Sequence, residues 1–337
     1  MFNNKVIFIS GGTGSFGSRF LEKLLKDYKP KKIIIFSRDE YKQFLMEKLF
    51  PIIKYPCLRF FLGDIRDLER LKIAMNGVDY VVHAAALKHV PAAEYNPMEF
   101  VKTNIHGAEN IIQASIHQKV KKVIALSTDK AANPINLYGA TKLASDKIFI
   151  AANNIVGIKG TVFSVVRYGN VLGSRGSVVP YFDDLIKKGA KFLPITNSKM
   201  TRFWITLDHG VDFVFKSFKR MSGGETFIPK IPSVRITDLA KAMAPNLKTK
   251  IIGIRPGEKI HELMCPNEMS DQTIEFKDHY VIFPSPKNFD KKTNFFINKL
   301  KEKGKKVSEN FEYDSKSNKK FLSINEIKNL NKNFFFR

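Results

Sequence analysis

A glycine-rich turn near the N-terminus constrains the fold more than any other feature of this chain. It reads GGTGSFG, from Gly11 to Gly17, and stands between an apolar run over 5–10 and an amphipathic stretch over 19–28. Glycines at this spacing let the backbone approach a pyrophosphate, and the N-terminus of the following helix offers free N–H groups. Glycines also make ordinary turns, but a position between a strand and a helix favours a dinucleotide site.

The segments that follow alternate between apolar runs and amphipathic stretches, which predicts βαβ units and an α/β fold with a doubly wound parallel sheet. We expect strands over 5–10, 31–37, 58–64, 79–86, 121–128 and 161–170, and helices over 19–28, 41–50, 68–75 and 104–116.

We expect three parts in the chain. Residues 1–170 would form the dinucleotide-binding domain, which also receives a helix near 205–220. The pattern loosens from Val171 onward, where glycine, serine and proline become frequent, and this predicts a smaller substrate-binding lobe made mainly by residues 171–285. Residues 286–337 would form a C-terminal extension.

The chain is basic, with 56 Lys and Arg against 32 Asp and Glu and a formal net charge of +24. Such a surplus can bind nucleic acid or an anionic membrane. Because the lysines are spread along the chain without a long basic block, we interpret them as solvated surface and expect neither partner.

Two cysteines, Cys57 and Cys265, are too few for a disulfide framework or a four-ligand zinc site. No apolar run reaches the length of a membrane-spanning helix, and the N-terminus lacks the basic flank of a signal peptide. We therefore expect a cytoplasmic protein without a bound metal.

The end of the second predicted strand bears on the choice of cofactor. Sites that prefer NAD place an acidic residue about 20 residues after the glycines. Here Ser37 and Arg38 precede Asp39, and Lys42 follows one helical turn later. The serine and the two cations would accept a 2′-phosphate, so we expect NADP, while Asp39 could instead cap the next helix.

Further cofactor contacts are expected along the same edge of the sheet. The small residues at the end of the fourth strand allow close backbone approach, although small residues also occur there for packing. The expected contacts are Gly11, Thr13, Gly14, Ser15, Phe16 and Gly17 in the glycine turn, Asp64 and Ile65 after the third strand, Ala84, Ala85 and Ala86 after the fourth, Lys88 beyond it, and Tyr138 and Lys142 further along the chain.

A tyrosine and a lysine stand four residues apart, at Tyr138 and Lys142, on one face of a predicted helix. A nearby ammonium would lower the pKa of the phenol, so that the phenolate could act as a general base near neutral pH. Such a pair is common on surfaces. This one follows a strand that ends in Ser127 and Thr128, downstream of the glycine turn.

On these residues the chain resembles the extended short-chain dehydrogenase/reductases that modify nucleotide sugars, which have a Rossmann fold. In detail, the C5-inverting UDP-N-acetylglucosamine 4,6-dehydratases are similar to it in STDKAANPINLYGATK, AAALKHVPAAEYNP, RYGNVLGSRGSVVP, MTRFWITL, RPGEKIHE and the late EYDSKSNKKFLSINEI. The resemblance implies NADP-dependent dehydration of UDP-N-acetylglucosamine to the β-L-arabino 4-keto-6-deoxy sugar, the first step of pseudaminic acid synthesis. Tyr138 favours this branch, because related capsule-pathway dehydratases tend to lack a tyrosine there. We also expect a homo-oligomer.

The resemblance also implies the catalytic roles. After Thr128, Asp129 would be the acid that protonates the departing 6-hydroxyl, and Lys130 the base that removes the C5 proton. Tyr138 would take the 4-hydroxyl proton. Lys130 can be a base only if its pKa is depressed, by burial or by a neighbouring cation such as Lys142. Without the family context, Asp129 and Lys130 could equally be a turn and a surface charge.

Substrate contacts are expected mainly after the sixth strand, from Lys88, Asn170, Val171, Ser174, Arg175, Thr196, Met200, Arg255 and Glu258. Arg255 and Glu258 suit a pyrophosphate and a ribose hydroxyl, and Thr196 and Met200 would flank the uracil by resemblance.

His261 and Glu262 begin a zinc-protease-like motif, but Cys265 replaces its second histidine, so we set that motif aside. Two other functions stay open. One is a C5-retaining dehydratase or a 4-epimerase of the same superfamily. The other is a non-catalytic protein that binds NADP or nucleic acid.

Overall fold

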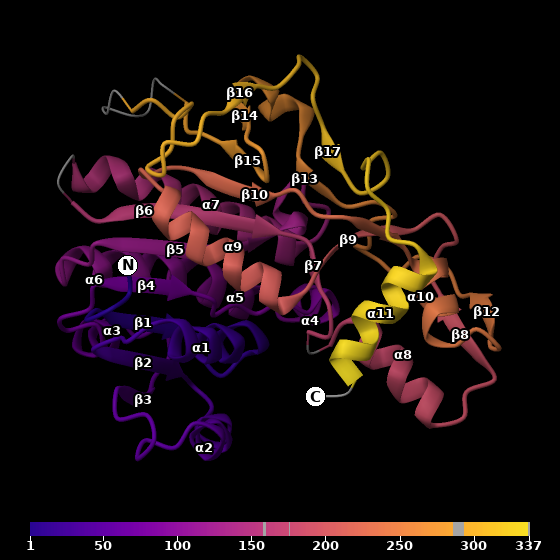
Figure 1. Cartoon of the computed structure of the whole chain (residues 1–337), viewed down its shortest axis with the longest axis horizontal. Helices are drawn as coiled ribbons and strands as arrows, with labels where there is room; N and C mark the ends of the chain where they lie inside the picture. Colours follow the sequence, from indigo (N-terminus) through magenta and orange to yellow (C-terminus); the bar gives the residue numbers. More distant parts are fainter. Residues whose placement is uncertain (158–159, 175, 286–292, 336–337) are drawn as a thin grey trace.

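A parallel sheet forms the centre of the molecule, as the alternating sequence pattern predicts. The computed structural model describes residues 1–157, 160–174, 176–285 and 293–335. Within these ranges seven strands run parallel: β1 (Val6–Ser10), β2 (Lys32–Ser37), β3 (Leu58–Leu62), β4 (Tyr80–His83), β5 (Lys122–Thr128), β6 (Val162–Tyr168) and β10 (Thr226–Pro229). Three antiparallel strands extend them: β15 (His279–Ile282), β14 (Thr273–Glu275) and β16 (Lys305–Lys306). The order is β16-β14-β15-β10-β6-β5-β4-β1-β2-β3 (Figure 1).

The parallel strands are continuous apolar runs because helices cover both faces of the sheet. All five residues of β1 are buried. Ile7 and Ile9 face one core, which α1 (Ser15–Asp27) and α9 (Leu207–Arg220) complete. Phe8 faces the other core, formed with α3 (Leu68–Ala74), α6 (Gly107–His117) and α7 (Leu137–Val156). After β2, α2 (Glu40–Leu49) buries only Gln43 and Met46.

The helix predicted over 104–116 is present, but it begins with a π-helical turn and follows two short helices that the sequence did not predict. The helical region after β4 consists of α4 (Val90–Tyr95), α5 (Pro97–Phe100), the π-helical turn η1 (Val101–His106) and then α6. Proline lies in the first turn of both α4 and α5, where its missing N–H is tolerated and where it starts a new helix.

The second lobe has its own small sheets and its own core. In it β7 (Asn170–Val171) pairs with β9 (Thr201–Ile205), β9 with β11 (Ser233–Arg235), and β8 (Phe192–Ile195) with β12 (Lys248–Ile251). Its helices are α8 (Val178–Lys187), α10 (Ile236–Met243) and α11 (Ile324–Phe335). The yellow C-terminal helix α11 lies beside α10 (Figure 1), and Ile327 is buried in the core of the lobe.

The layers of the fold do not follow the residue ranges expected from the sequence. We expected 171–285 mainly to form the second lobe, but β10, β14 and β15 from this range continue the central sheet, because β10 pairs with β6 and gives β15 an edge to pair with. The helix near 205–220 packs on the sheet as expected, in the form of α9. The C-terminal extension is divided between both parts: β16 joins the large sheet, whereas α11 joins the lobe.

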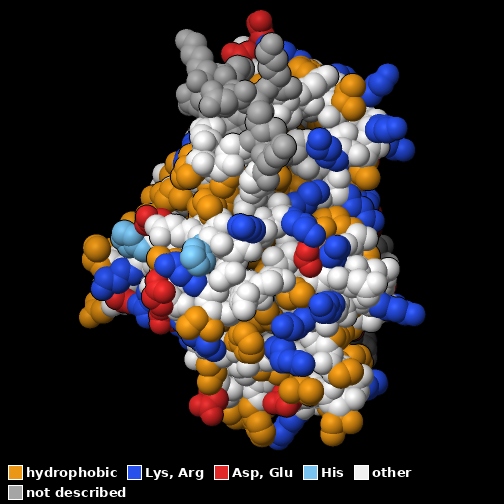
Figure 2. All heavy atoms as spheres, turned by 90° about the vertical axis from the view of Figure 1, so that its left-hand side faces the viewer, with side chains coloured by type: hydrophobic (Ala, Val, Ile, Leu, Met, Phe, Trp, Pro, Cys, Tyr) orange, Lys and Arg blue, Asp and Glu red, His pale blue; other side chains and the backbone are white. Residues whose placement is uncertain are grey.

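Charged side chains are dispersed over the surface. On the face shown in Figure 2, Lys and Arg are scattered among apolar and uncharged side chains instead of forming one block. Across the described ranges, none of the helices combines the length and the apolarity needed to cross a bilayer.

The contact between α1 and α9 should carry much of the stability of one sheet face. Phe20 on α1 is fully buried, and its ring centroid lies 4.6 Å from that of Phe215 on α9. We expect Phe20→Ala to lower the free energy of unfolding by about 3–5 kcal/mol, measured by urea denaturation. Phe44→Ala, on the half-exposed face of α2, is the control and should cost less than about 1 kcal/mol. Equal losses in the two variants would contradict this account.

Candidate active site

The glycine turn joins β1 to α1 and comes very close to the strand beside it. Gly11 has a φ of +65°, and a Cβ atom built there would lie 2.8 Å from the backbone nitrogen of Ala85. A Cβ atom on Gly17 would lie 2.4 Å from the carbonyl oxygen of Gly12. Glycine is therefore required at both positions. Gly14 is the N-cap of α1 and provides no side-chain cap, so the first-turn N–H groups receive no hydrogen bond from a capping side chain.

A cavity of about 230 Å³ lies against this turn and gathers eleven of the residues predicted to bind a cofactor. Its walls come from the carboxyl ends of β1, β2, β3 and β4, which meet at one edge of a parallel sheet. The predicted residues that line it are Gly11, Thr13, Gly14, Ser37, Arg38, Asp39, Lys42, Ile65, Ala84, Ala85 and Ala86, and Phe36, Gly63 and Thr103 complete it.

Seven other predicted cofactor residues are not among those that line this cavity: Ser15, Phe16, Gly17, Asp64, Lys88, Tyr138 and Lys142. The ring of Phe16 stacks on Phe20 and Tyr168. The carboxylate of Asp64 accepts from Arg66 at 2.7 Å and pairs with Arg38 at 3.4 Å.

Asp39 has the role of a helix cap. Its carboxylate accepts a hydrogen bond from the backbone N–H of Lys42 at 2.9 Å and pairs with the Lys42 ammonium at 2.5 Å. Ser37 is buried, and its hydroxyl accepts from the side-chain amide of Gln43 at 3.1 Å. The most exposed polar group of this set is Arg38, whose side chain is 48% exposed.

Two buried polar residues that the sequence did not single out hold the loops of this edge together. The Ser10 hydroxyl lies 2.8 Å from Nδ1 of His83, which joins the ends of β1 and β4. In η1, the amide of Asn104 accepts from the N–H of Leu87 and donates to its carbonyl, both at 2.9 Å, and also donates to the Thr141 hydroxyl at 3.1 Å. Asn104 thereby ties the loop after β4 to α7. π-helical turns occur frequently at functional sites.

The turn after β5 is buried, so a mere surface charge is the wrong interpretation of it. It is a single 3-10 turn, η2 (Asp129–Ala131), capped by Thr128. The Thr128 hydroxyl donates to Oδ1 of Asp129 at 3.0 Å and accepts from the N–H of Lys130 at 3.3 Å. Asp129 is 1% exposed, and its Oδ1 also accepts from Nζ of Lys130 at 3.1 Å.

A second buried carboxylate, which sequence reasoning set aside, completes this turn. Oε1 of Glu262 lies 2.9 Å from Nζ of Lys130 and 3.5 Å from Nε of Arg202. Glu262 was considered only as part of a rejected zinc motif, and its presence within RPGEKIHE was the available signal. In the described part of the chain no three His, Cys, Asp or Glu side chains could hold a metal ion together.

The charges around Lys130 reverse the expectation for its pKa. Burial lowers the pKa of this ammonium, but the adjacent carboxylates of Asp129 and Glu262 outweigh burial, and the pKa is raised above its ordinary value. Lys142 is not among the neighbours that shift the pKa of Lys130. Burial, with Glu262 nearby, raises the pKa of Asp129. Lys130 and Arg202 overcome burial at Glu262 and lower the pKa of that carboxyl.

The pKa of Tyr138 also departs from the prediction. Tyr138 and Lys142 are both buried on α7, and burial raises the pKa of the phenol to about 12, although Lys130 and a hydrogen bond with Thr128 act in the opposite direction. Burial lowers the pKa of Lys142, and Asp146, one turn further along α7, opposes the shift. The cation that opposes burial at the phenol is Lys130 and not the predicted Lys142, and the effect of burial is the larger one.

Apart from Lys88, which follows β4, the described residues that were predicted to contact the substrate lie in the second lobe or at its junction with the sheet. On β7, Oδ1 of Asn170 is buried without a hydrogen-bond partner among the described residues. Thr196 and Met200 are buried together, with the hydroxyl 3.4 Å from the sulfur. The remaining predicted residues are Val171 on β7, Ser174 in the turn after it, Arg255, whose N–H donates to Glu258, and Arg175, which lies outside the described residues.

One predicted substrate residue connects with the turn after β5. Oε1 of Glu258 lies 3.7 Å from Nη2 of Arg202, and Arg202 in turn contacts Glu262, the partner of Lys130. A chain of alternating charges therefore runs from the lobe to the end of β5.

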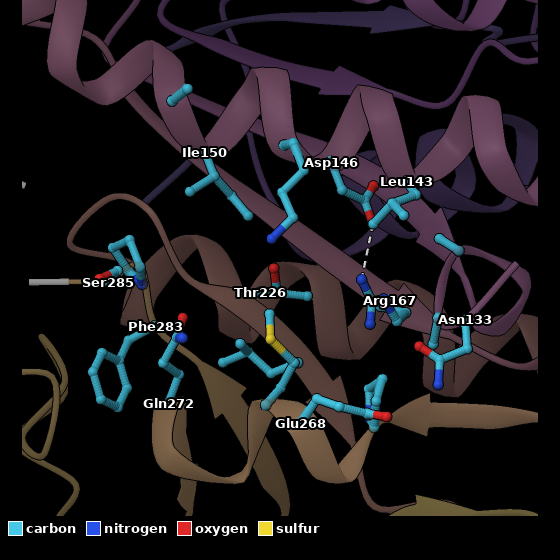
Figure 3. A pocket seen from close by; sticks show the side chains of 18 of the residues that line it. Asn133, Leu143, Asp146, Ile150, Arg167, Thr226, Glu268, Gln272, Phe283 and Ser285 are labelled. Atoms are coloured by element: carbon cyan, nitrogen blue, oxygen red, sulfur yellow. Dashed lines mark hydrogen bonds and ion pairs between the residues drawn. The ribbon is translucent and has the colours of Figure 1, made fainter. Parts of the chain in front are cut away.

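A larger cavity, of about 850 Å³, lies behind the turn after β5 (Figure 3). Ala131 and Ala132 of the turn form part of its wall, together with residues of α7, β6 and β15. Within it Asp146 pairs with Arg167 at 3.2 Å and accepts from the Ser127 hydroxyl at 2.6 Å. Tyr138 and Lys142 line neither cavity, whereas the glycine turn lines the smaller one, so the smaller cavity is the candidate cofactor site and the turn after β5 is the candidate site of the chemistry.

The glycine turn, the end of β5 and the Tyr138 and Lys142 pair on α7 define an extended short-chain dehydrogenase/reductase. More particularly, the chain belongs to the polysaccharide biosynthesis protein family, whose sequence model matches residues 7–284. It is 62% identical, over 97% of each chain, to a Campylobacter jejuni protein named UDP-N-acetylglucosamine 4,6-dehydratase (inverting).

Two other comparisons bear on fold and function. A Rickettsia conorii protein named UDP-glucose 4-epimerase is 42% identical over 98% of this chain and 96% of its own. The crystal structure of Pen from Bacillus thuringiensis covers 100% of both chains with a TM-score of 0.88 and 38% identity.

The buried His83 should make stability depend on pH. Burial, with Lys142 nearby, lowers the pKa of His83 from 6.5 to about 3, so below pH 6.5 the unfolded chain binds a proton that the folded chain excludes. As pH falls from 6.5 to about 5, the wild type should therefore lose about 2 kcal/mol more of its free energy of unfolding than His83→Asn does. Urea denaturation across this range measures the difference. Parallel pH curves for the two proteins would contradict it.

Proposed function

We propose that the chain dehydrates UDP-N-acetylglucosamine across C5 and C6 with oxidation at C4, and inverts C5. The observation that carries the proposal is a second acid–base pair near Tyr138, formed by the buried Asp129 and by Lys130, whose side chain is 25% exposed. A reaction at C4 alone needs a single acid–base group, whereas elimination needs one group at C5 and another at the departing 6-hydroxyl. The Campylobacter relative, at 62% identity, carries the name of this activity.

The cavity against the glycine turn fits a nicotinamide dinucleotide. Any side chain at Gly11 would fill the space beside Ala85, and the start of α1 suits a pyrophosphate. Arg38 and Lys42 at the end of β2 suit a 2′-phosphate, which supports NADP as the cofactor. The bound dinucleotide would supply a two-electron acceptor and donor that ends each cycle unchanged, so the net reaction is that of a lyase.

The roles of the side chains follow from their positions. Tyr138 takes the proton of the 4-hydroxyl as C4 becomes a ketone, and the ketone acidifies the C5 hydrogen. Lys130 removes that hydrogen as a proton, and Asp129 donates a proton to the 6-hydroxyl, which leaves as water. The raised pKa of Asp129 suits a donor. Lys130 and Tyr138 have raised pKa values in the ligand-free chain, so each must release its proton before it can act as a base.

A 4-epimerase is the second candidate, because the Rickettsia relatives at 42% identity carry that name. Epimerisation at C4 requires no proton transfer at C5 and no departing group at C6. Asp129 and Lys130 would then have no chemical role, which is why we rank this function second.

Three further features belong to the proposal. A place at the start of pseudaminic acid synthesis accords with C5 inversion. A cytoplasmic location accords with Cys57 and Cys265, which are both free thiols. A homo-oligomer accords with the exposed apolar side chains of Tyr95, Met98 and Ile135, on or next to α4, α5 and α7.

Incubation with UDP-N-acetylglucosamine in D₂O tests the function. Early product should be a 4-keto-6-deoxy sugar with deuterium at C5 and the proton couplings of the β-L-arabino form, observed by NMR. Lys130→Ala should lower formation of this product at least about a hundredfold, because it removes a general base. The control is Lys147→Ala, which replaces an exposed lysine of α7 and should keep wild-type activity. A C4 epimer as the sole product would establish the epimerase instead, and a product that retains C5 would exclude inversion.

Replacement of Arg38 tests the choice of cofactor. A charge-assisted contact with the 2′-phosphate contributes about 1.5–3 kcal/mol, so Arg38→Ala should weaken NADP binding about ten- to hundredfold and leave NAD binding nearly unchanged. Arg59→Ala, an exposed arginine on β3 outside the cavity, should alter neither affinity. Isothermal calorimetry measures both. Equal affinities of the wild type for NADP and NAD would remove the basis of this prediction.

A further inference from the structure

We propose that Glu262 is a positioning residue that fixes the Lys130 ammonium and controls the release of its proton, and that Ser315 of the C-terminal extension holds Glu262 in place. The inference rests on the function proposed above, since it concerns the base of that reaction. It assigns a task in the site to residues more than 130 positions away from Lys130 in the sequence and to a segment that lines neither cavity.

The Lys130 ammonium contacts two buried carboxylates. Its Nζ lies 2.9 Å from Oε1 of Glu262 and 3.1 Å from Oδ1 of Asp129. Both carboxylates are 1% exposed, so water cannot solvate them, and a buried charge requires an opposite charge beside it. In each carboxylate the second oxygen, Oδ2 of Asp129 and Oε2 of Glu262, is buried without a hydrogen-bond partner among the described residues. The Lys130 ammonium therefore balances two carboxylates that have few other partners.

The other charged and titratable groups around this pair come from three further elements. Arg202 on β9 lies 3.5 Å from Glu262, and itself contacts Glu258 at 3.7 Å. Lys259, three residues before Glu262, adds positive charge near it, and Tyr138 on α7 lies near Lys130. Asp129 and Glu262 balance Lys130 and Arg202 in formal charge. Loss of the Glu262 charge would leave an excess positive charge, which favours release of the proton from Lys130.

The extension holds Glu262 through its backbone. Ser315 is fully buried, and its hydroxyl accepts from the N–H of Glu262 at 2.8 Å while its own N–H donates to the Glu262 carbonyl at 2.8 Å. The Ser315 hydroxyl also lies 2.7 Å from that of Thr201, next to Arg202. The strand β17 (Tyr313–Asp314), directly before Ser315, pairs with β13 (Leu263–Cys265), directly after Glu262. Ser315 thus holds Glu262 directly and also contacts Thr201, the residue before Arg202.

The experiment is the pH profile of kcat for dehydration between about pH 6 and 11, a range that extends past the ordinary lysine pKa of about 10.4, with NADP and UDP-N-acetylglucosamine both saturating. As pH increases, kcat should rise where Lys130 loses its proton, and we call this rise the Lys130 limb. Removal of the negative charge in Glu262→Gln should shift this limb by about one to three pH units toward lower pH. Glu262→Asp keeps the charge and should stay near the wild-type profile. Asp271→Asn, an exposed carboxylate outside the site, is the control and should not shift it.

Ser315→Ala provides the second variant, needed if Glu262→Gln does not fold. It leaves every charge in place but removes the hydroxyl that holds Glu262, and should shift the same limb in the same direction by a smaller amount. An unchanged pH profile in Glu262→Gln would overturn the inference. If only Ser315→Ala folds, an unchanged profile in that variant would overturn it. In either case, dehydration by the wild type would still support the proposed function. A wild-type chain that forms no 4-keto product would overturn the proposed function and this inference with it.

Discussion

The Lys130 ammonium, held between the buried carboxylates of Asp129 and Glu262, is the interaction on which the rest of the site depends. Neither carboxylate could stay ionised at 1% exposure without an opposite charge. The contact draws together the turn after β5, the segment before β13 and, through Ser315, the C-terminal extension. A requirement of electrostatics thereby explains why distant parts of the chain fold against one another at this point.

The sheet explains why the cofactor cavity and the reacting groups are neighbours. Parallel strands place their carboxyl ends at one edge, so the turns after β1, β4 and β5 meet there without any special loop. Asn104 and His83 then join these turns to one another and to α7 by buried hydrogen bonds. The apolar cores on both faces keep the edge rigid, which favours precise placement of side chains.

Local sequence patterns predicted the fold and some of the residues of the candidate site, but not the contacts between distant parts of the chain. A few neighbouring residues are enough to predict the glycine turn, each parallel strand, and the Tyr138 and Lys142 pair. The capping role of Asp39 was foreseen as an alternative. Glu262 escaped because its partner Lys130 lies far away in the sequence, and no short motif records that contact. The predicted pKa direction was wrong at Tyr138 because burial outweighs the nearby cation, and at Lys130 because Asp129 and the distant Glu262 together outweigh burial. Because contacts between distant parts of the chain were not predicted, β10, β14 and β15 were assigned to the second lobe.

The central claim is that this edge of the sheet oxidises C4 and reduces C6 of one sugar within a single turnover. UDP-N-acetylglucosamine that carries deuterium at C4 tests it most directly, with NADP present and no added reductant. Mass spectrometry and NMR should find the label at C6 of the 4-keto product and no net change in the dinucleotide. Loss of the deuterium to solvent, or its accumulation in the dinucleotide as the sugar is consumed, would contradict the account.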